Sequence, residues 1–172
     1  MNVARARRTL ALVMAGAGAA LAALPAAAQF NMVPPPQCRT PAATAASDSA
    51  EAYRVEASRH IYECFPGRVY VGLLPPLIFG VVTLEVEIDE KGQVNALSVV
   101  RKPAADIVEP WLVALVRRAA PFPVPAHLPG GAVRFVETFF IDRSGLFQAQ
   151  SLVEGQRGTP AVEVSTPLSA TP

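Results

Sequence analysis

The chain has 172 residues, 51% of them hydrophobic and 17% charged, which is enough for one domain with a core of ordinary size. Its 15 basic and 14 acidic residues nearly balance, and removing the three arginines of residues 1–8 leaves 12 basic against 14 acidic. Nucleic-acid binding needs an excess of Lys and Arg, so we expect no nucleic-acid partner.

Residues 1–28 have the pattern of a cleavable signal peptide. Three arginines in residues 1–8 form a positive start, and residues 10–24 are an apolar run. A proline ends this run, and small residues precede a cleavage site after Ala28. We therefore expect export to the periplasm. The alternative is a retained inner-membrane anchor, because residues 9–37 contain no charge.

A Pro- and Ala-rich arm follows at residues 29–47 and contains Cys38, while the second cysteine is Cys64. Two cysteines in an exported chain favour a disulfide. It closes a loop of about 26 residues and contributes about 3 kcal/mol in the chain-entropy model. The alternative is two independent, buried thiols.

Two segments have the spacing of amphipathic helices. Residues 48–64 and 106–120 each repeat apolar side chains at steps of three or four, and each starts with an acidic pair at capping-box spacing. Proline follows each segment, so we expect both helices to end there.

The clearest strand is residues 82–88, where apolar and polar side chains alternate. Residues 89–92 then predict a turn, and residues 93–101 return as the second strand of a hairpin. A third strand is predicted at residues 133–141, with two less distinct faces because Glu137 interrupts an apolar set.

The turn after the third strand repeats the first turn. Both have the form Asp-x-x-Gly, and the Ala and Ser that follow also match. We therefore expect a fourth strand at residues 146–153. The fold class is α+β, with a small antiparallel sheet of three to four strands and two helices on one face, in the order α-β-β-α-β(-β). This domain covers residues 48–153, and residues 154–172 are expected to be a disordered tail.

Residues 69–79 are almost wholly apolar but contain two prolines and are too short to span a membrane. They predict either an edge strand followed by a turn or an apolar surface loop.

The residues that usually carry chemistry are sparse. The two histidines, His60 and His127, do not have the spacing of a metal site, and no nucleophile or phosphate-loop motif occurs. Glu85, Glu87 and Asp89 are explained as the solvated face of a strand. We therefore expect no catalytic, cofactor or metal site.

Three features resemble the C-terminal domains of TonB and TolA-like proteins. They are the strand Gly-Val-Val-Thr-Leu-Glu-Val at residues 80–86, the turn Asp-x-x-Gly-x-Val at residues 89–94, and the string Val-Arg-Arg-Ala-Ala-Pro-Phe-Pro-Val-Pro at residues 116–125. The resemblance implies a small periplasmic domain that contacts other envelope proteins. In TonB the domain pairs with an extended segment of an outer-membrane receptor.

The chain departs from the TonB pattern in its cleavable signal and in lacking a long Pro-rich spacer. The expected function is therefore a periplasmic protein–protein interaction module that binds an envelope partner, possibly an extended segment of an outer-membrane protein. The alternative is a membrane-anchored accessory energy transducer, with membrane contact only through the retained signal. An envelope enzyme or enzyme inhibitor is a less favoured third possibility.

The candidate binding surface is the free edge of the second hairpin, because unpaired strand edges accept further strands. If the return strand covers the third strand, the surface moves to the new outer strand or to the apolar segment 69–79. The candidate residues on the hairpin and on the apolar segment are Val133, Phe135, Glu137, Phe139, Gln148, Tyr70, Leu73 and Leu74.

Overall fold

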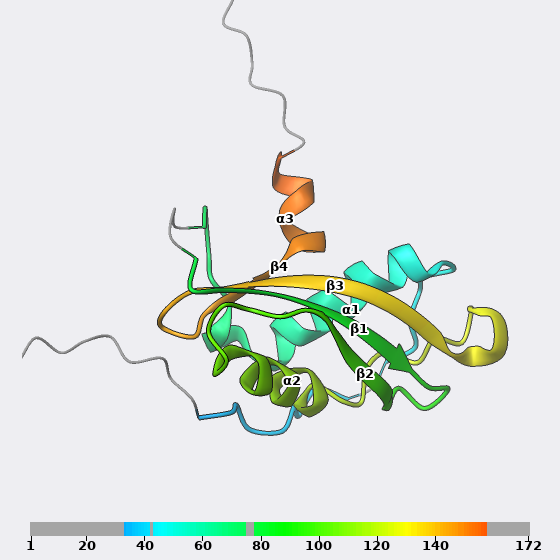
Figure 1. The fold of residues 1–172 in the computed structure, drawn as a ribbon. Helices are drawn as coiled ribbons and strands as arrows, with labels where there is room; N and C mark the ends of the chain where they lie inside the picture. Colours follow the sequence, from blue (N-terminus) through cyan, green and yellow to red (C-terminus); the bar gives the residue numbers. More distant parts are fainter. Residues whose placement is uncertain (1–32, 42, 75–77, 158–172) are drawn as a thin grey trace, which may run out of the picture.

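The computed structural model describes residues 33–41, 43–74 and 78–157, and confirms an α+β fold with a four-stranded antiparallel sheet (Figure 1). The strand order is β2-β1-β3-β4. The elements in chain order are α1 (Ala50–Cys64), η1 (Pro66–Arg68), β1 (Gly80–Ile88), β2 (Val94–Arg101), α2 (Val108–Arg118), η2 (Pro129–Gly131), β3 (Val133–Ile141), β4 (Phe147–Ala149) and α3 (Gln150–Arg157).

Both predicted helices form, but their N-termini differ from the prediction. The N-cap of α1 is Ser49, whose side chain accepts a hydrogen bond from the backbone N–H of Ala52, so the predicted capping role of Asp48 is wrong. Helix α2 begins at Val108 without a side-chain cap, so the box predicted from Asp106 does not form either. Burial of the apolar faces therefore decides where these helices lie.

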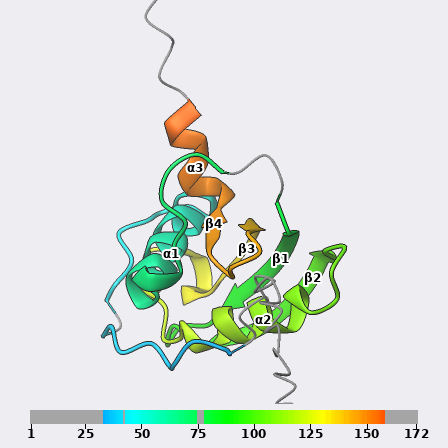
Figure 2. The same ribbon diagram turned by 90° about the vertical axis from the view of Figure 1, so that its left-hand side faces the viewer.

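The core lies between one face of the sheet and the two helices, α1 and α2 (Figure 2). Every second residue of β1 and β3 is buried, and these residues meet the apolar stripes of the helices. Fully buried members of this core include Tyr53, Ile61, Leu84, Leu112, Leu115, Phe122, Phe139 and Ile141.

The two hairpin turns share one design, as predicted. In the first, the Asp89 carboxylate accepts the backbone N–H groups of Lys91 and Gln93, each at 2.8 Å, and Gly92 has a φ of +75°. In the second, the Asp142 carboxylate accepts the N–H groups two and four residues later, at 2.8 and 2.9 Å, and Gly145 has a φ of +82°. Glycine suits both positions because it adopts positive φ without steric cost.

The predicted fourth strand is present, but it is shorter than the predicted residues 146–153. Strand β4 contains three residues, and the chain then turns into α3, which projects from the end of β4 (Figure 1). Helix α3 also reaches Arg157, so residues 154–157 are not part of a tail. The rest of the predicted tail, and the predicted signal peptide, lie outside the described residues.

Candidate functional site

The outer edge of β3 is only partly covered. On its inner side β3 pairs with β1 along its whole length, from Val133 to Ile141, without a break in register. On its outer side β4 pairs only with the last three residues, Phe139 to Ile141. The first six residues of β3 therefore have no neighbouring strand on that side among the described residues.

Backbone groups of successive strand residues point alternately to either side, so the open groups can be identified. The carbonyl oxygen of Ile141 accepts from the N–H of Phe79, on the β1 side, at 3.0 Å. The backbone N–H and C=O groups of the even-numbered residues of β3 therefore point away from β1, toward the outer edge of the sheet. Phe140 faces β4, and the N–H of Thr138 donates to a carboxylate oxygen of Glu137 at 2.9 Å.

Arg134 and Val136 are the remaining residues of β3 whose backbone N–H and C=O groups point away from β1. Within the described ranges, no hydrogen bond uses their backbone N–H or C=O groups on this side. The side chain of Val136 is on the sheet face opposite the helices, and the residue is 43% exposed. An edge with free donors and acceptors is able to pair with another extended chain.

A groove with a volume of about 330 Å³ lies beside these two residues. One wall is the first turns of α1 and the other is the edge and outer face of the sheet. The lining residues are Ala50, Glu51, Arg54, Glu85, Arg134, Phe135 and Val136.

The rim of the groove carries charges of both signs. Arg134 forms an ion pair with Glu87 at 2.7 Å, and Asn95 also donates to the Glu87 carboxylate. The hydrogen bond from Arg134, followed by that from Asn95, lowers the pKa of Glu87. Arg54 pairs with Glu51 at 3.4 Å on the helix side. Such a rim favours zwitterionic or neutral partner segments over strongly charged ones.

Glu137 follows the open residues of β3 and is the centre of a buried hydrogen-bond network. The residue is 1% exposed and lies on the core side of β3. Its carboxylate accepts from the Ser58 hydroxyl at 2.9 Å and from the backbone N–H of Ser151 at 3.3 Å, in addition to Thr138. The Ser151 hydroxyl also donates to Ser58 Oγ at 3.0 Å. This network ties α1, β3 and the start of α3 together.

Four of the predicted binding residues do not face a partner. Val133, Phe135, Glu137 and Phe139 are buried on the helix side of β3. Sequence reasoning missed their neighbours Arg134 and Val136, whose backbone groups are open. The alternation along this strand is the signal that identifies them, because Glu137 belongs to the buried set and does not interrupt it.

The prediction that Gln148 stands on a free edge is wrong. Gln148 is 4% exposed, and its Nε2 donates to the carbonyl oxygens of Tyr70 at 2.8 Å and Gly72 at 2.7 Å. The N–H of Tyr70 donates to the carbonyl oxygen of Phe147 at 2.9 Å, beside a parallel bridge between Val69 and Phe147. The outer edge of β4 is therefore already covered by this segment.

The rest of the apolar segment forms a surface loop, one of the two predicted alternatives. Val71 is 89% exposed and Leu73 is 93% exposed, while Leu74 is half-buried. Residues 75–77 lie outside the described residues. This loop is at the end of the sheet where β3 finishes, so the structure does not bring Tyr70, Leu73 and Leu74 to the groove at Arg134 (Figure 1).

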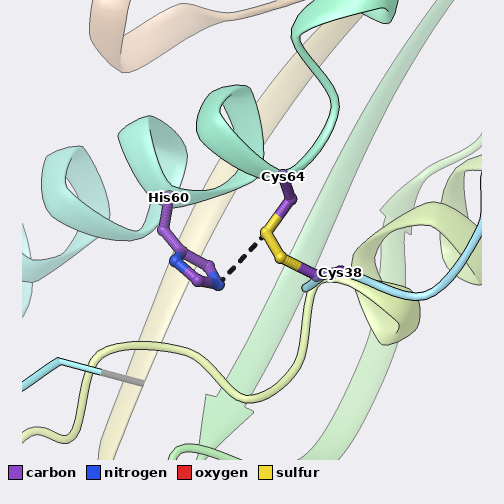
Figure 3. A group of neighbouring side chains, drawn as sticks. All are labelled: Cys38, His60 and Cys64. Atoms are coloured by element: carbon purple, nitrogen blue, oxygen red, sulfur yellow. Dashed lines mark hydrogen bonds between the residues drawn. A yellow bond between two sulfur atoms is a disulfide. The ribbon is translucent and has the colours of Figure 1, made fainter. Parts of the chain in front are cut away.

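The predicted disulfide is present between Cys38 and Cys64, beside His60 (Figure 3). The two sulfur atoms and a ring nitrogen of His60 lie within 4.8 Å of one another. Both sulfur atoms are used by the disulfide, so neither is a thiolate able to bind a metal ion. His60 Nε2 contacts the carbonyl oxygen of Ala119 at 2.8 Å, which satisfies this buried ring.

No helix among the described residues combines the length and apolar character needed to cross a membrane. Comparison with protein families, with curated proteins and with solved structures finds no match to this chain.

Proposed function

We propose that this domain is a protein–protein interaction module of the TonB C-terminal type, working in the cell envelope. It binds an extended segment of an envelope partner by adding that segment as a strand to the outer edge of β3. The observation that carries the proposal is the open backbone of Arg134 and Val136 beside the groove. The Cys38–Cys64 disulfide supports an oxidising compartment.

The open part of β3 sets the size of the bound segment. Six strand residues span roughly 20 Å, so a segment of about six residues fits along residues 133–138 before it meets β4. Arg134 and Val136 together offer two N–H donors and two C=O acceptors. Alternate side chains of the segment enter the groove beside α1, where Glu51 and Arg54 can select them.

The test compares two substitutions at Val136 in the exported protein. Val136→Pro removes the outward-pointing N–H, and proline is tolerated in an edge strand at such a position. Val136→Thr keeps that N–H and the β-branched shape. Peptides selected from a display library against the wild-type protein serve as ligands, and their affinities are measured by calorimetry.

We expect Val136→Pro to weaken binding at least about tenfold, because it removes a backbone donor and leaves a buried acceptor on the peptide unpaired. Val136→Thr should bind nearly as wild type. Equal affinities for the proline and threonine variants, both with wild-type circular dichroism, would show that strand addition at β3 is wrong.

A further inference from the structure

The sequence after α3 contains one stretch with the pattern of a strand. Residues 161–166, here called the tail segment, have the sequence Ala-Val-Glu-Val-Ser-Thr and lie between two prolines. Apolar Val162 and Val164 alternate with polar Glu163 and Ser165, which is the period of a strand with one apolar face. Proline has no N–H group to donate, so the flanking prolines limit the pairing stretch to these six residues.

The tail segment matches the open part of β3 in length. Residues 133–138 of β3 also number six, and no strand pairs with their outer side within the part of the chain that the structure describes. After them, β4 pairs with β3 from Phe139 onward. The backbone groups of Arg134 and Val136 point to this open side. An added strand of six residues therefore fills the edge from the start of β3 to β4.

Helix α3 leaves the domain next to this edge. It starts beside β3, where the N–H of Ser151 donates to the Glu137 carboxylate at 3.3 Å. The eight residues Gln150–Arg157 span about 12 Å as a helix. Residues 158–160 let the tail segment begin roughly 13 Å from the end of α3, which is enough to return to the level of Glu137. A segment that enters at this end runs toward Val133, antiparallel to β3.

We propose that the tail segment adds to the outer edge of β3 as an antiparallel strand, so that the chain's own residues close this edge until a partner displaces them. The competition rests on the proposed function, because both segments use the same backbone groups. A strand on a short tether has an effective concentration in the millimolar range, so a pairing too weak to detect between separate molecules still occupies the edge. The tail segment therefore lowers the affinity for every partner by the same factor.

The alternation of the tail segment sets which side faces the groove. Opposite residues of an antiparallel pair lie on the same side of the sheet. With Glu163 opposite Arg134, both valines lie on the side of Phe135, against the apolar part of the groove. The guanidinium of Arg134 has five N–H donors, so it can bind Glu163 as well as Glu87. This register therefore satisfies both the apolar and the charged side chains of the tail segment.

The other charges around the groove favour the same register. Glu51 and Arg54 pair with each other at 3.4 Å on the helix side. Glu85 is opposite Val136 in the pairing of β1 with β3. A shift of the tail segment by two residues would place Glu163 opposite Val136, on the side of Glu85, and the repulsion between like charges disfavours that arrangement.

Amide hydrogen exchange, followed by NMR on the full-length exported protein, tests the pairing without a partner. Val162→Asp places a charge against the apolar side of the groove, and Leu168→Asp is the matched control, because it makes the same change outside the tail segment. The N–H groups of Arg134 and Val136 should exchange about five- to tenfold more slowly in wild type and in Leu168→Asp than in Val162→Asp. Glu163→Pro removes an N–H that points toward β3, so these groups should exchange as fast in it as in Val162→Asp.

A second measurement tests the competition for the edge. The peptides selected from the display library should bind Val162→Asp about five- to tenfold more tightly than wild type, since the tail segment no longer occupies the edge. Leu168→Asp should bind them as wild type does.

The two measurements distinguish a failure of the tail pairing from a failure of the proposed function. Equal exchange in wild type and Val162→Asp would overturn the tail pairing, and the partner site stands if the peptides bind both proteins alike. Slower exchange in wild type, with no peptide bound by any variant, overturns the proposed function and supports the tail pairing. Slower exchange together with equal peptide affinities would show that the two segments do not share an edge, and would overturn the competition.

Discussion

The carboxylate of Glu137 is the acceptor around which three separate parts of the chain meet. It receives hydrogen bonds from Ser58 of α1, from the backbone beside it in β3, and from the backbone of Ser151 at the start of α3. A negative side chain at a helix N-terminus is favourable because it faces the unpaired N–H groups and the positive end of the helix dipole. Glu137 therefore stabilises the position of α3 as well as the core.

Replacing Glu137 with leucine should destabilise the domain. The change leaves the Ser58 hydroxyl and the N–H groups of Thr138 and Ser151 without this acceptor, so we expect a loss of about 2–4 kcal/mol in the free energy of unfolding. Urea denaturation measures this loss. Glu137→Gln is the matched control, because it keeps the shape and one acceptor oxygen, and it should lose about half as much. A leucine variant as stable as wild type would contradict the stabilising role.

Sequence reasoning placed Glu137 on β3 but could not place its partners. Ser58 precedes it by 79 positions and Ser151 follows it by 14, and neither separation leaves a local pattern. A single charged residue at an apolar strand position predicts an interruption of the buried face. Its burial becomes understandable only when the donors from α1 and α3 are known.

At the scale of elements, the turn between β1 and β2 is held against the chain that follows α2. The carbonyl oxygen of Gly92 accepts from the N–H of Phe122 at 2.7 Å. A side chain at Gly92 would place its Cβ only 2.2 Å from the carbonyl oxygen of Phe122. The first hairpin and the end of α2 therefore fit together only because this position has no side chain.

Comparing Gly92→Ala with Gly130→Ala separates the cost of a positive φ from the cost of the steric contact with Phe122. Both glycines have nearly the same positive φ, +75° and +74°, but a Cβ at Gly130 meets nothing within 4 Å. Gly130→Ala should therefore cost only the conformational term of about 1–2 kcal/mol. Gly92→Ala should cost about 1–3 kcal/mol more, because the backbone must also move. Thermal unfolding of both variants measures the difference, and equal losses would contradict the close fit.

The disulfide joins the proline-rich arm to the end of α1. Cys64→Ser should lower the free energy of unfolding by about 2–4 kcal/mol, since the bridge closes a loop with a sequence separation of 26. Chemical denaturation measures this, and Cys38→Ser should give the same loss because one bridge is removed in either case. Two titratable thiols in denatured, unreduced wild-type protein would contradict the bridge.

The hairpin turns were predictable because the Asp and Gly that shape them lie within four residues. The length of strand β4 was not, because the repeat of the first turn predicts a return strand but contains no signal for its early end. The chain instead turns into α3, whose first N–H groups are near Glu137. The open edge at Arg134 and Val136 follows from that early end of β4, so the sequence could indicate strand pairing but not which residues it leaves free.

At the scale of the whole molecule, both helices that complete the core are on one face of the sheet, and the opposite face carries exposed side chains such as Val100 and Val136. The described residues of the arm, 33–41 and 43–47, are hydrogen-bonded to the end of α2 and to the segment after it. The N–H of Cys38 donates to the carbonyl oxygen of Arg118, and the N–H of Ala45 donates to that of Val124. The described part of the arm therefore lies against the end of α2 and the segment that follows it.

The predicted cleavage after Ala28 decides whether the domain is released or anchored. Intact-mass analysis of the protein from a periplasmic fraction should give a mass that starts at Gln29, because small residues precede that bond. A mass that includes residues 1–28, found in the membrane fraction, would instead support the anchored accessory transducer.

The strand order has a consequence for the kinetics of folding. The pairings β1–β2 and β3–β4 join strands that follow one another closely, whereas β1–β3 joins residues about 50 positions apart over nine residue pairs. Closing the longer loop loses more chain entropy, and this loss occurs before the contacts between the strands stabilise the pairing. We expect the two hairpins to form early and independently, and the docking of β1 against β3 to limit the folding rate.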